Sequence, residues 1–511
     1  MKAKIIVIDA GSSKFKTCFF NLETRDAFRC DESSSEKKAM FTTVALIFNM
    51  ANNVLQRIQV VNHPYPLPHH VTLSRDEAFV FFYNWKNLVF PISDQLTTDY
   101  VERAKKRNPN FVHCDEDTLL INSENVEILG NGVNVTIRDY HVERAKKFSE
   151  FVERKVGDKI FFSKRDITKA LFSHCFFQHI NLPGGIKIED CHIFVSIPSK
   201  VLFREREMLM EVVASVSESK NVHIVKESVA LCYFFYYSYY SNIDIFRSTK
   251  KQSSKAVAVD IGHYSSDIAE VVLENEHCIN MTSAQCLYHG GHKINVDLLN
   301  VMYTVDEIAE MRKMEERYWK ELYKMSECKE TIFNMDTIWN KNGAYLSGQD
   351  GCLIENTFIS FEDIKKILDK NFDDILFALR DLVENSRSSY LILGGPISKS
   401  LLFSNHVKSQ LSDLNCEIIF TKNLFDICIG TYLYACNRLA QPVNMSQTDV
   451  ESLESVLSSP SKVSFTNTSP IDHIFLFCSK DIVSTKVPDY IKKRYKDITR
   501  EMYNQMIEDG K

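Results

Sequence analysis

Length, composition and charge narrow the classes of protein to which this chain can belong. Its 511 residues, 44% of them hydrophobic, suffice for two to four domains, and its formal net charge of −6 argues against nucleic acid as a partner. Fourteen cysteines without a CxxC pair or metal-type spacing indicate reduced thiols in a cytoplasmic protein, and no apolar run is long enough to cross a membrane.

The first predicted element is a β-hairpin at the N-terminus. A strand over residues 5–8 ends at Asp9, and Gly11, Ser12 and Ser13 follow before a second strand returns. Such a turn suits a phosphate and its Mg²⁺, because the carboxylate can hold the ion through water while backbone N–H groups and hydroxyls contact phosphate oxygens. An ordinary hairpin turn has the same composition, so the motif alone leaves both interpretations open.

Strands and helices alternate over the rest of the first half, apart from residues 76–160, whose pattern is the least legible in the chain. The predicted order is a helix over 163–180, a buried strand over 191–197, a helix over 201–219, a strand over 221–227 and a helix from Ser228. This order is typical of a parallel sheet covered by helices. The aromatic run at 232–240 fits a buried helix better than a platform for stacked bases, because no basic residues lie beside it.

A near copy of the first hairpin opens the second half. In "AVAVDIGHYSSDIAEVVL", residues 256–273, an apolar strand ends at Asp260, Gly262 and Ser265 follow, and the returning strand begins with Asp267. Two such units predict two similar lobes that face each other across a cleft, with the phosphates of one nucleotide between them.

Further elements complete the second half. The predicted order is a helix opening at 289–299, a helical region over 305–333, a strand pair over 342–360 turning at Gly348–Gly351, an amphipathic helix over 361–386, a strand, Gly-Gly turn and helix over 388–411, and a helix over 425–440. We therefore expect the following organisation: a first lobe over 1–245 with an insertion at 76–160, a second lobe over 246–440, a Ser/Thr-rich linker over 441–470 and a strand–helix extension over 471–511.

In this order and spacing the segments resemble the superfamily of actin, sugar kinases and heat-shock ATPases. The nearest resemblance is to the ATPase domain of the heat shock protein 70 family, among its divergent members without a standard substrate-binding domain. The segments are "IDAGSSKFK", "IFVSIPS", "VKESVALCYFF", "VDIGHYSSD", "YHGGHKINVDLL", "LILGGPIS" and "CIGTYLYA". The resemblance implies an α/β fold with two ribonuclease H-like lobes, the actin-like ATPase fold, around a cleft for ATP or ADP with Mg²⁺.

The resemblance also implies roles for individual residues. Asp9 and Asp260 would hold Mg²⁺ through water, Glu227 would polarise the attacking water, and Lys105 is similar to the lysine that reaches the transferred phosphate, although a surface lysine is the alternative. The catalytic residues would then be Glu227, Asp260 and Lys105. The nucleotide-binding residues would be Asp9, Gly11, Ser12, Ser13, Lys16, Gly262, Ser265, Asp267, Gly290, Gly291, Lys329, Glu330, Gly394, Gly395 and Pro396, while Gly430 would let two helices approach closely at a hinge.

Some features depart from the heat-shock pattern. His263 and Tyr264 stand where that family has glycines, which allow backbone amides to approach the β- and γ-phosphates, so the two rings either tilt away or narrow the site. Lys16 matches the phosphate lysine of actin-type filament proteins better, and Lys329 with Glu330 looks like the Lys-Glu pair beside adenine in actin.

Four functions follow from these features. The leading hypothesis is an ATP-binding, heat shock protein 70-like switch or chaperone with weak ATPase activity at most, with protein partners or clients and no nucleic acid or membrane partner. The alternatives are an actin-like filament or scaffold protein, a small-molecule (sugar) kinase and a scaffold that binds no nucleotide.

Overall fold

The computed structural model places the greater part of both predicted lobes. It describes residues 3–12, 14–23, 26–30, 40–49, 55–61, 71–74, 77–82, 85–86, 118–122, 127–129, 133–134, 159–201, 203–238, 254–275, 278–287, 290–313, 315–334, 349–354, 357–421, 425–439 and 474–478. The predicted linker over 441–470 and the helix expected after residue 478 lie outside these ranges.

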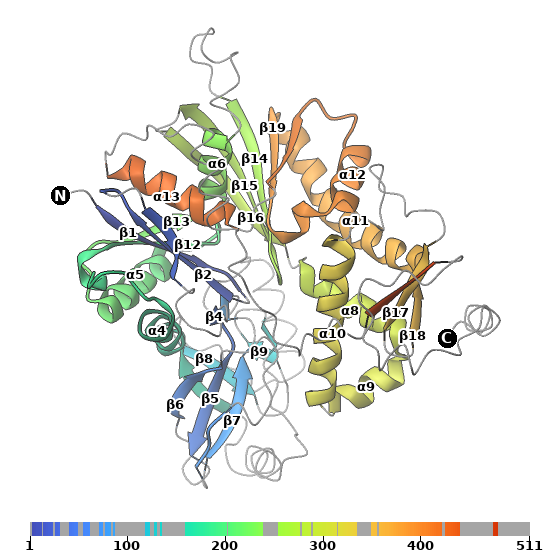
Figure 1. The fold of residues 1–511 in the computed structure, drawn as a ribbon, viewed down its shortest axis with the longest axis horizontal. Helices are drawn as coiled ribbons and strands as arrows, with labels where there is room; N and C mark the ends of the chain where they lie inside the picture. Colours follow the sequence, from blue (N-terminus) through green and yellow to red (C-terminus); the bar gives the residue numbers. More distant parts are fainter. Residues whose placement is uncertain are drawn as a thin grey trace.

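One mixed sheet forms the centre of the first lobe (Figure 1). Its strands are β1 (Lys4–Ala10), β2 (Lys14–Asn21), β3 (Asp26–Arg29), β12 (His192–Ile197) and β13 (Val222–Lys226), with β4 (Met40–Phe41) paired to β2. In the order β13-β12-β1-β2-β3, the first three strands of the chain are antiparallel and β12 and β13 run parallel to β1. Alternate residues of β1 enter two separate cores, which explains why this strand is apolar throughout.

The second lobe repeats the same strand order. Its strands are β14 (Ser254–Ile261), β15 (Ser266–Asn275), β16 (Cys278–Leu287), β19 (Tyr390–Gly394) and β20 (Glu417–Phe420). They form the sheet β16-β15-β14-β19-β20, with β14, β15 and β16 antiparallel and β19 and β20 parallel to β14. Three antiparallel strands followed by two parallel ones define a ribonuclease H-like lobe, so the predicted α/β fold of two similar lobes, the actin-like ATPase fold, is confirmed.

Two helices lie in the layer between the sheets: α6 (Glu227–Ser238), which follows β13, and α13 (Asp426–Arg438), which follows β20 (Figure 1). They share one hydrophobic core with residues of both sheets. The helices approach each other closely at Gly430, where a Cβ atom would lie 1.9 Å from the carbonyl oxygen of Ala230. Glycine is therefore required for the helices to pack at this distance.

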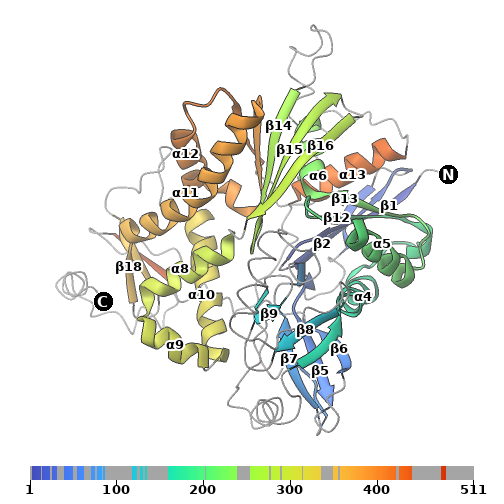
Figure 2. The same ribbon diagram turned by 180° about the vertical axis from the view of Figure 1, so that it is seen from behind.

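The outer faces of the sheets carry further helices (Figures 1 and 2). In the first lobe these are α4 (Lys164–His174), which continues as a π-helical turn (Cys175–His179), and α5 (Phe203–Ser217). In the second lobe, α11 (Phe361–Ser386) and α12 (Leu401–Gln410) lie beside the sheet. Farther from it, α8 (Gly291–Met302) contacts α11, and α10 (Glu315–Asn334) contacts α8 and α9 (Val305–Lys313). Ser360 caps α11 by accepting a 3.1 Å hydrogen bond from the backbone N–H of Asp363.

The predicted turn at Gly348–Gly351 is wrong. Gly351 lies within β17 (Gln349–Ile354), where it pairs with Ser360 at the end of β18 (Thr357–Ser360). The pairing of β17 with β21 (Ile474–Cys478) shifts register between Gln349 and Gly351, so this glycine marks an irregularity inside a strand and not a turn. Because β21 completes this three-stranded sheet, the predicted C-terminal strand docks on the second lobe.

Two small sheets extend the first lobe beyond its central sheet (Figure 2). One contains β5 (Val44–Asn49), β6 (Leu55–Val60) and β7 (Glu77–Phe82) in the order β6-β5-β7. The other contains β8 (Thr118–Asn122), β9 (Glu127–Leu129), β10 (Val133–Asn134) and β11 (Lys159–Ser163) in the order β10-β9-β8-β11. The described part of the 76–160 segment is therefore mainly strand.

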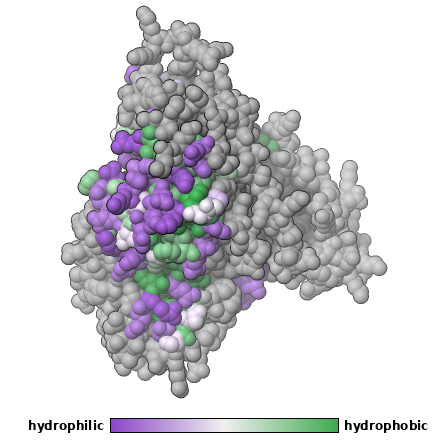
Figure 3. All heavy atoms as spheres, turned by 60° about the vertical axis from the view of Figure 1, so that its left-hand side comes forward, coloured by the Kyte–Doolittle hydropathy of each residue, from purple (hydrophilic) through white to green (hydrophobic). Residues whose placement is uncertain are grey.

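On the face that Figure 3 shows, the coloured residues are mostly hydrophilic, with hydrophobic residues interspersed among them. Large apolar side chains are exposed at Phe177, Phe203, Val301 and Val305 among the described residues. No helix in the described ranges combines the length and the apolar character that a membrane span requires. Eight cysteines have described side chains, and each of these is free; all of them are buried except the half-buried Cys416.

Candidate functional site

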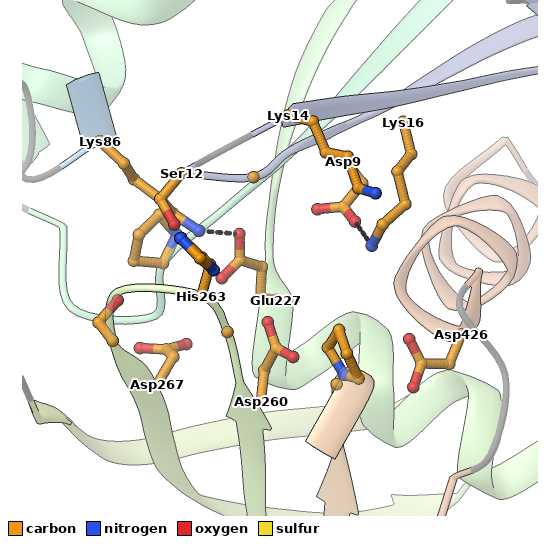
Figure 4. A pocket seen from close by; sticks show the side chains of 16 residues that line it. Asp9, Ser12, Lys14, Lys16, Lys86, Glu227, Asp260, His263, Asp267 and Asp426 are labelled. Carbon is orange, nitrogen blue, oxygen red and sulfur yellow. Dashed lines mark hydrogen bonds and ion pairs between the residues drawn. The ribbon is translucent and has the colours of Figure 1, made fainter. Parts of the chain in front are cut away.

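A pocket opens between the two lobes, where the first and second hairpins face each other (Figure 4). The predicted residues that line it are Asp9, Gly11, Ser12, Lys16, Glu227, Asp260, Gly262, Ser265, Asp267, Gly395 and Pro396. The remaining lining residues are Lys14, Lys86, Pro198, His263 and Asp426. The empty space within the pocket, including the part open to solvent, is about 750 Å³. The two hairpin aspartates therefore share one crevice.

On the first lobe, Asp9 lies opposite Lys16 in the β1–β2 ladder. Lys16 Nζ donates a 2.6 Å hydrogen bond to Asp9 Oδ2. Burial alone would lower the pKa of Lys16, but the neighbouring carboxylate outweighs burial and raises that pKa above its usual value. The turn between these strands is tight, since a Cβ atom at Gly11 would lie 2.5 Å from the carbonyl oxygen of Lys14.

Glu227, the first residue of α6, forms a buried ion pair with Lys86 (Figure 4). The Lys86 Nζ to Glu227 Oε1 distance is 2.5 Å, and the Glu227 side chain is 1% exposed. The neighbouring Trp85 donates a 3.0 Å hydrogen bond from Nε1 to the carbonyl oxygen of Gly11. Lys86 is therefore anchored beside the turn of the first hairpin. Lys105, to which the resemblance gave the role of reaching the transferred phosphate, lies outside the described residues.

On the second lobe, Asp260 and Asp267 lie opposite each other in the β14–β15 ladder. Asp267 Oδ2 accepts hydrogen bonds from the backbone N–H and the hydroxyl of Ser199, at 2.9 and 2.6 Å. Because Ser199 follows β12, this contact joins the second hairpin to the first lobe.

Asp426, which the sequence analysis missed, is the first residue of α13. One of its carboxylate oxygens accepts a 2.5 Å hydrogen bond from the hydroxyl of Thr421, and the other accepts a 2.7 Å bond from the backbone N–H of Ile427. It occupies the position in the second lobe that Glu227 occupies in the first, so the internal repeat is the signal that could have identified it.

The pocket contains more acidic than basic side chains. Its described lining has five carboxyl groups, on Asp9, Glu227, Asp260, Asp267 and Asp426, and three lysines, Lys14, Lys16 and Lys86. Burial raises the pKa of Glu227 to about 8, an effect that Lys86 opposes and Asp260 increases. Burial, with repulsion from Asp426 and Asp9, raises the pKa of Asp260 to about 7. These two carboxyl groups therefore retain protons near neutral pH unless a cation enters the pocket.

The donor set fits Mg²⁺ that is held largely through water and phosphate. In the part of the chain that the structure describes, no three His, Cys, Asp or Glu side chains gather closely enough to hold a metal ion directly. Two buried carboxylate oxygens that line the pocket, Glu227 Oε2 and Asp267 Oδ1, accept no hydrogen bond from the described residues. Hydrated Mg²⁺ uses one or two carboxylates together with phosphate oxygens, so these oxygens and Asp9 and Asp260 suit it.

Three other predicted residues support the second hairpin from outside the pocket. The backbone N–H of Gly291 donates a 3.1 Å hydrogen bond to the carbonyl oxygen of Gly262. A Cβ atom at Gly290 would lie 2.6 Å from that same oxygen. Lys329, which is buried in α10, donates a 3.0 Å hydrogen bond to the carbonyl oxygen of Gly291. Ser13 and the side chain of Glu330 lie outside what the structure describes.

The two glycines at the end of β19, Gly394 and Gly395, face different surroundings. Gly395 has φ +88°, and a Cβ atom there would lie 2.2 Å from the carbonyl oxygen of Ile261, so only glycine fits beside the second hairpin. Gly394 faces the side chains of Leu231 and Thr421 instead, and it does not line the pocket.

The two residues that replace glycines have different positions. His263 lines the pocket. Tyr264 is not among the lining residues and packs against a hydrophobic cluster of the first lobe. The turn of the second hairpin thus places one ring at the pocket and the other against the first lobe.

Comparisons with known proteins give a similarity of fold. No protein-family model matches the sequence, and no curated protein sequence matches it significantly. Among solved structures, the chain is similar to MreB 5 of Spiroplasma citri bound to AMPPNP, with a TM-score of 0.47 and 13% sequence identity, over 86% of this chain and 98% of that one.

Proposed function

We propose that the chain binds ATP or ADP with Mg²⁺ between its two lobes. The observation that supports this most directly is that Asp9 and Asp260, at equivalent positions of two similar hairpins, line the same pocket. Glycine and serine of each turn line it as well, which provides backbone N–H groups and hydroxyls on both sides of a polyphosphate.

The residues of the pocket would divide the binding task. Asp9 and Asp260 would hold Mg²⁺ through water, and the ion would neutralise charge on the phosphates. Lys14, Lys16 and Lys86 supply the positive charge that phosphate oxygens require. Gly395 and Pro396, at the edge formed by β19, would face the nucleoside.

Hydrolysis should be weak. Glu227 would have to orient the attacking water, but it is paired with Lys86, and burial raises its pKa to about 8. A protonated carboxyl group is a poor proton acceptor. His263 also occupies space that glycine would leave to the phosphates.

These features favour a heat shock protein 70-like switch, in which the bound nucleotide sets the closure of the lobes about α6 and α13. A chaperone-like role with protein partners or clients belongs to the same proposal. So does a cytoplasmic location, because free cysteines are typical of reducing compartments.

An actin-like filament or scaffold protein is the second candidate. Lys16, which resembles the phosphate lysine of actin-type filament proteins, lines the pocket and donates a hydrogen bond to Asp9. Sedimentation with and without Mg·ATP separates the two candidates, since a filament protein pellets in a nucleotide-dependent manner and a monomeric switch stays in the supernatant.

Calorimetric titration with Mg·ATP and Mg·ADP tests nucleotide binding. We expect micromolar or tighter affinity for the wild type, about −8 kcal/mol, and at least about tenfold weaker binding for Asp260→Ala. The matched control is Asp306→Ala, on the exposed side of α9, which should bind like the wild type. Equal affinities of wild type and Asp260→Ala would refute the site.

A further inference from the structure

The tip of the second hairpin reaches across to the first lobe. Tyr264 and the half-buried Leu73 both pack against a small hydrophobic cluster of Ala45, Ile47, Val61 and Val71. Apart from Tyr264, these residues all come from residues 45–73 of the first lobe. The contact of Tyr264 with this cluster therefore joins the two lobes.

The cluster is a fixed surface, because β5 alternates between two cores. Val44 and Leu46 enter the main core of the first lobe, while Ala45 and Ile47 point to the opposite face and meet Tyr264. Each of these four side chains is 0% exposed. The surface that receives the Tyr264 ring is thus held by the packing of the lobe behind it.

Polar contacts fix the loop that completes this surface. Arg57 donates hydrogen bonds to the carbonyl oxygen of Thr72 and, at 3.0 Å, to Glu77 Oε2. The same carboxylate accepts a 2.8 Å bond from the backbone N–H of Ser74. Leu73 therefore stands on a loop that is tied to both β6 and β7.

Tyr264 is equally well supported on its own lobe. Its ring centroid lies 4.6 Å from that of His263 and 4.8 Å from that of His292. The backbone N–H of His292 donates a 2.6 Å hydrogen bond to the carbonyl oxygen of His263. Burial, with the charge of Lys329, lowers the pKa of both histidines, so uncharged rings surround the tyrosine.

The position of Tyr264 in the chain connects this contact to the pocket. Its neighbours His263 and Ser265 both line the pocket, as do Ser12 and Lys86 of the first lobe. A movement of the lobes that opened the phosphate end of the pocket would have to withdraw the ring from the cluster.

We propose that Tyr264 is a positioning residue that holds the phosphate end of the cleft closed and slows the release of bound nucleotide. The inference rests on the proposed nucleotide binding. The proposal explains why tyrosine stands at a position where the heat-shock pattern has glycine. Glycine has no side chain that could bridge the two lobes.

The dissociation rate of a fluorescent ATP analogue, N-methylanthraniloyl-ATP with Mg²⁺, measures this role by stopped-flow chase with excess unlabelled ATP. We expect Tyr264→Ala to release the analogue at least about tenfold faster than the wild type, because one buried aromatic contact is lost from the closed state. Tyr264→Phe keeps the ring and should stay within about threefold of the wild type. Val305→Ala, at a side chain that is 83% exposed, is the matched control for loss of an apolar residue and should leave the rate unchanged.

A double-mutant cycle with Leu73→Ala shows whether the contact itself is responsible. Each single variant should release nucleotide faster, and the double variant should be no faster than Tyr264→Ala, because both side chains pack against the same cluster and residues that share partners do not act additively. Multiplicative effects of the two substitutions, or release from Tyr264→Ala at the wild-type rate, would overturn the proposal. If Tyr264→Ala does not fold, Leu73→Ala tests the same contact from the other lobe.

If the proposed nucleotide binding is wrong, the wild type will not bind the analogue, and this result differs from a failure of the Tyr264 proposal. The contact is then tested without nucleotide by hydrogen exchange. Tyr264→Ala should increase amide exchange both at 262–265 and at 71–74, and Tyr264→Phe should not. Unchanged exchange in both segments would show that Tyr264 does not hold the lobes together.

Discussion

At the scale of single residues, the pocket depends on buried charges that stabilise one another. Lys86 and Glu227 come from segments 141 residues apart and are almost completely shielded from water. Removing one member of such a pair leaves the other charge buried without a partner. The resulting loss of folding stability is larger than the loss when both members are replaced by apolar side chains.

We therefore predict that Lys86→Met lowers the free energy of unfolding by about 3 kcal/mol, measured by urea denaturation without nucleotide at pH 9, above the pKa of Glu227, where this side chain is ionised. Adding Glu227→Gln to that variant should restore part of the loss, because the unpaired carboxylate is removed. The control is Lys365→Met, whose ion pair with Asp369 is partly exposed and should matter by about 0.5 kcal/mol. Equal stability of wild type and Lys86→Met would contradict the buried pair.

Much of the site could be predicted from the sequence, and the two residues that were missed, Lys86 and Asp426, were missed for different reasons. Asp9, Asp260 and Asp267 stand beside glycine and serine in a local pattern that occurs twice, so the sequence alone predicted them as site residues. Lys86 reaches the pocket through contacts between distant segments, and no local pattern surrounds it. Asp426 would have followed from aligning the start of α13 with the start of α6, where Glu227 was recognised.

At the scale of elements, most strands and helices could be predicted from apolar patterns, and the two similar lobes from the repeated hairpin. The strand pair near residue 350 was misplaced because glycine is common both in turns and in strand irregularities. The pairing of β17 with a strand more than a hundred residues away, β21, decides between them. That pairing is a tertiary effect and leaves no signal near Gly351.

The packing of α6 on α13 leads to the second prediction. Gly430→Ala places a methyl group 1.9 Å from the carbonyl oxygen of Ala230, so the helices must separate. We expect a loss of stability of about 2 kcal/mol or more in urea denaturation. Nucleotide affinity should fall as well, because the two helices begin with Glu227 and Asp426.

Gly184→Ala is the comparison for this prediction. At Gly184 φ is +60° and a Cβ atom would meet no other atom within 4 Å, so that substitution carries backbone strain alone. It should cost about 1 kcal/mol and leave nucleotide affinity unchanged. A similar cost at both glycines, with unchanged affinity at Gly430→Ala, would show that the helices adjust without disturbing the pocket.

At the scale of the whole molecule, the cleft couples protonation to folding and to ligand binding. The folded state raises the pKa of Glu227 from 4.5 to about 8 and that of Asp260 from 3.8 to about 7, mainly through burial. Between pH 5 and 7 the folded chain thus binds more protons at these groups than the unfolded chain does. Their contribution to stability is present at low pH and is lost as the pH rises through the folded-state values.

His263 and His292 oppose this trend, because their lowered pKa values destabilise the folded state at low pH. The contribution of Glu227 is therefore best obtained as the difference in stability between wild type and Glu227→Gln, measured by urea denaturation from pH 5.5 to 8. We predict that the wild type loses up to about 1.4 kcal/mol per pH unit relative to the variant in this range. A difference that does not change with pH would show that Glu227 keeps its usual pKa.

Binding of Mg·ATP should show the same linkage from the other direction. The cation favours ionised carboxylates, so binding to the wild type at pH 7 should release protons and strengthen as the pH rises from 6 to 8. Calorimetry in two buffers of different ionisation enthalpy counts these protons. Glu227→Gln should release fewer of them, and proton uptake by the wild type would show that the carboxyl groups of the pocket do not face the ion.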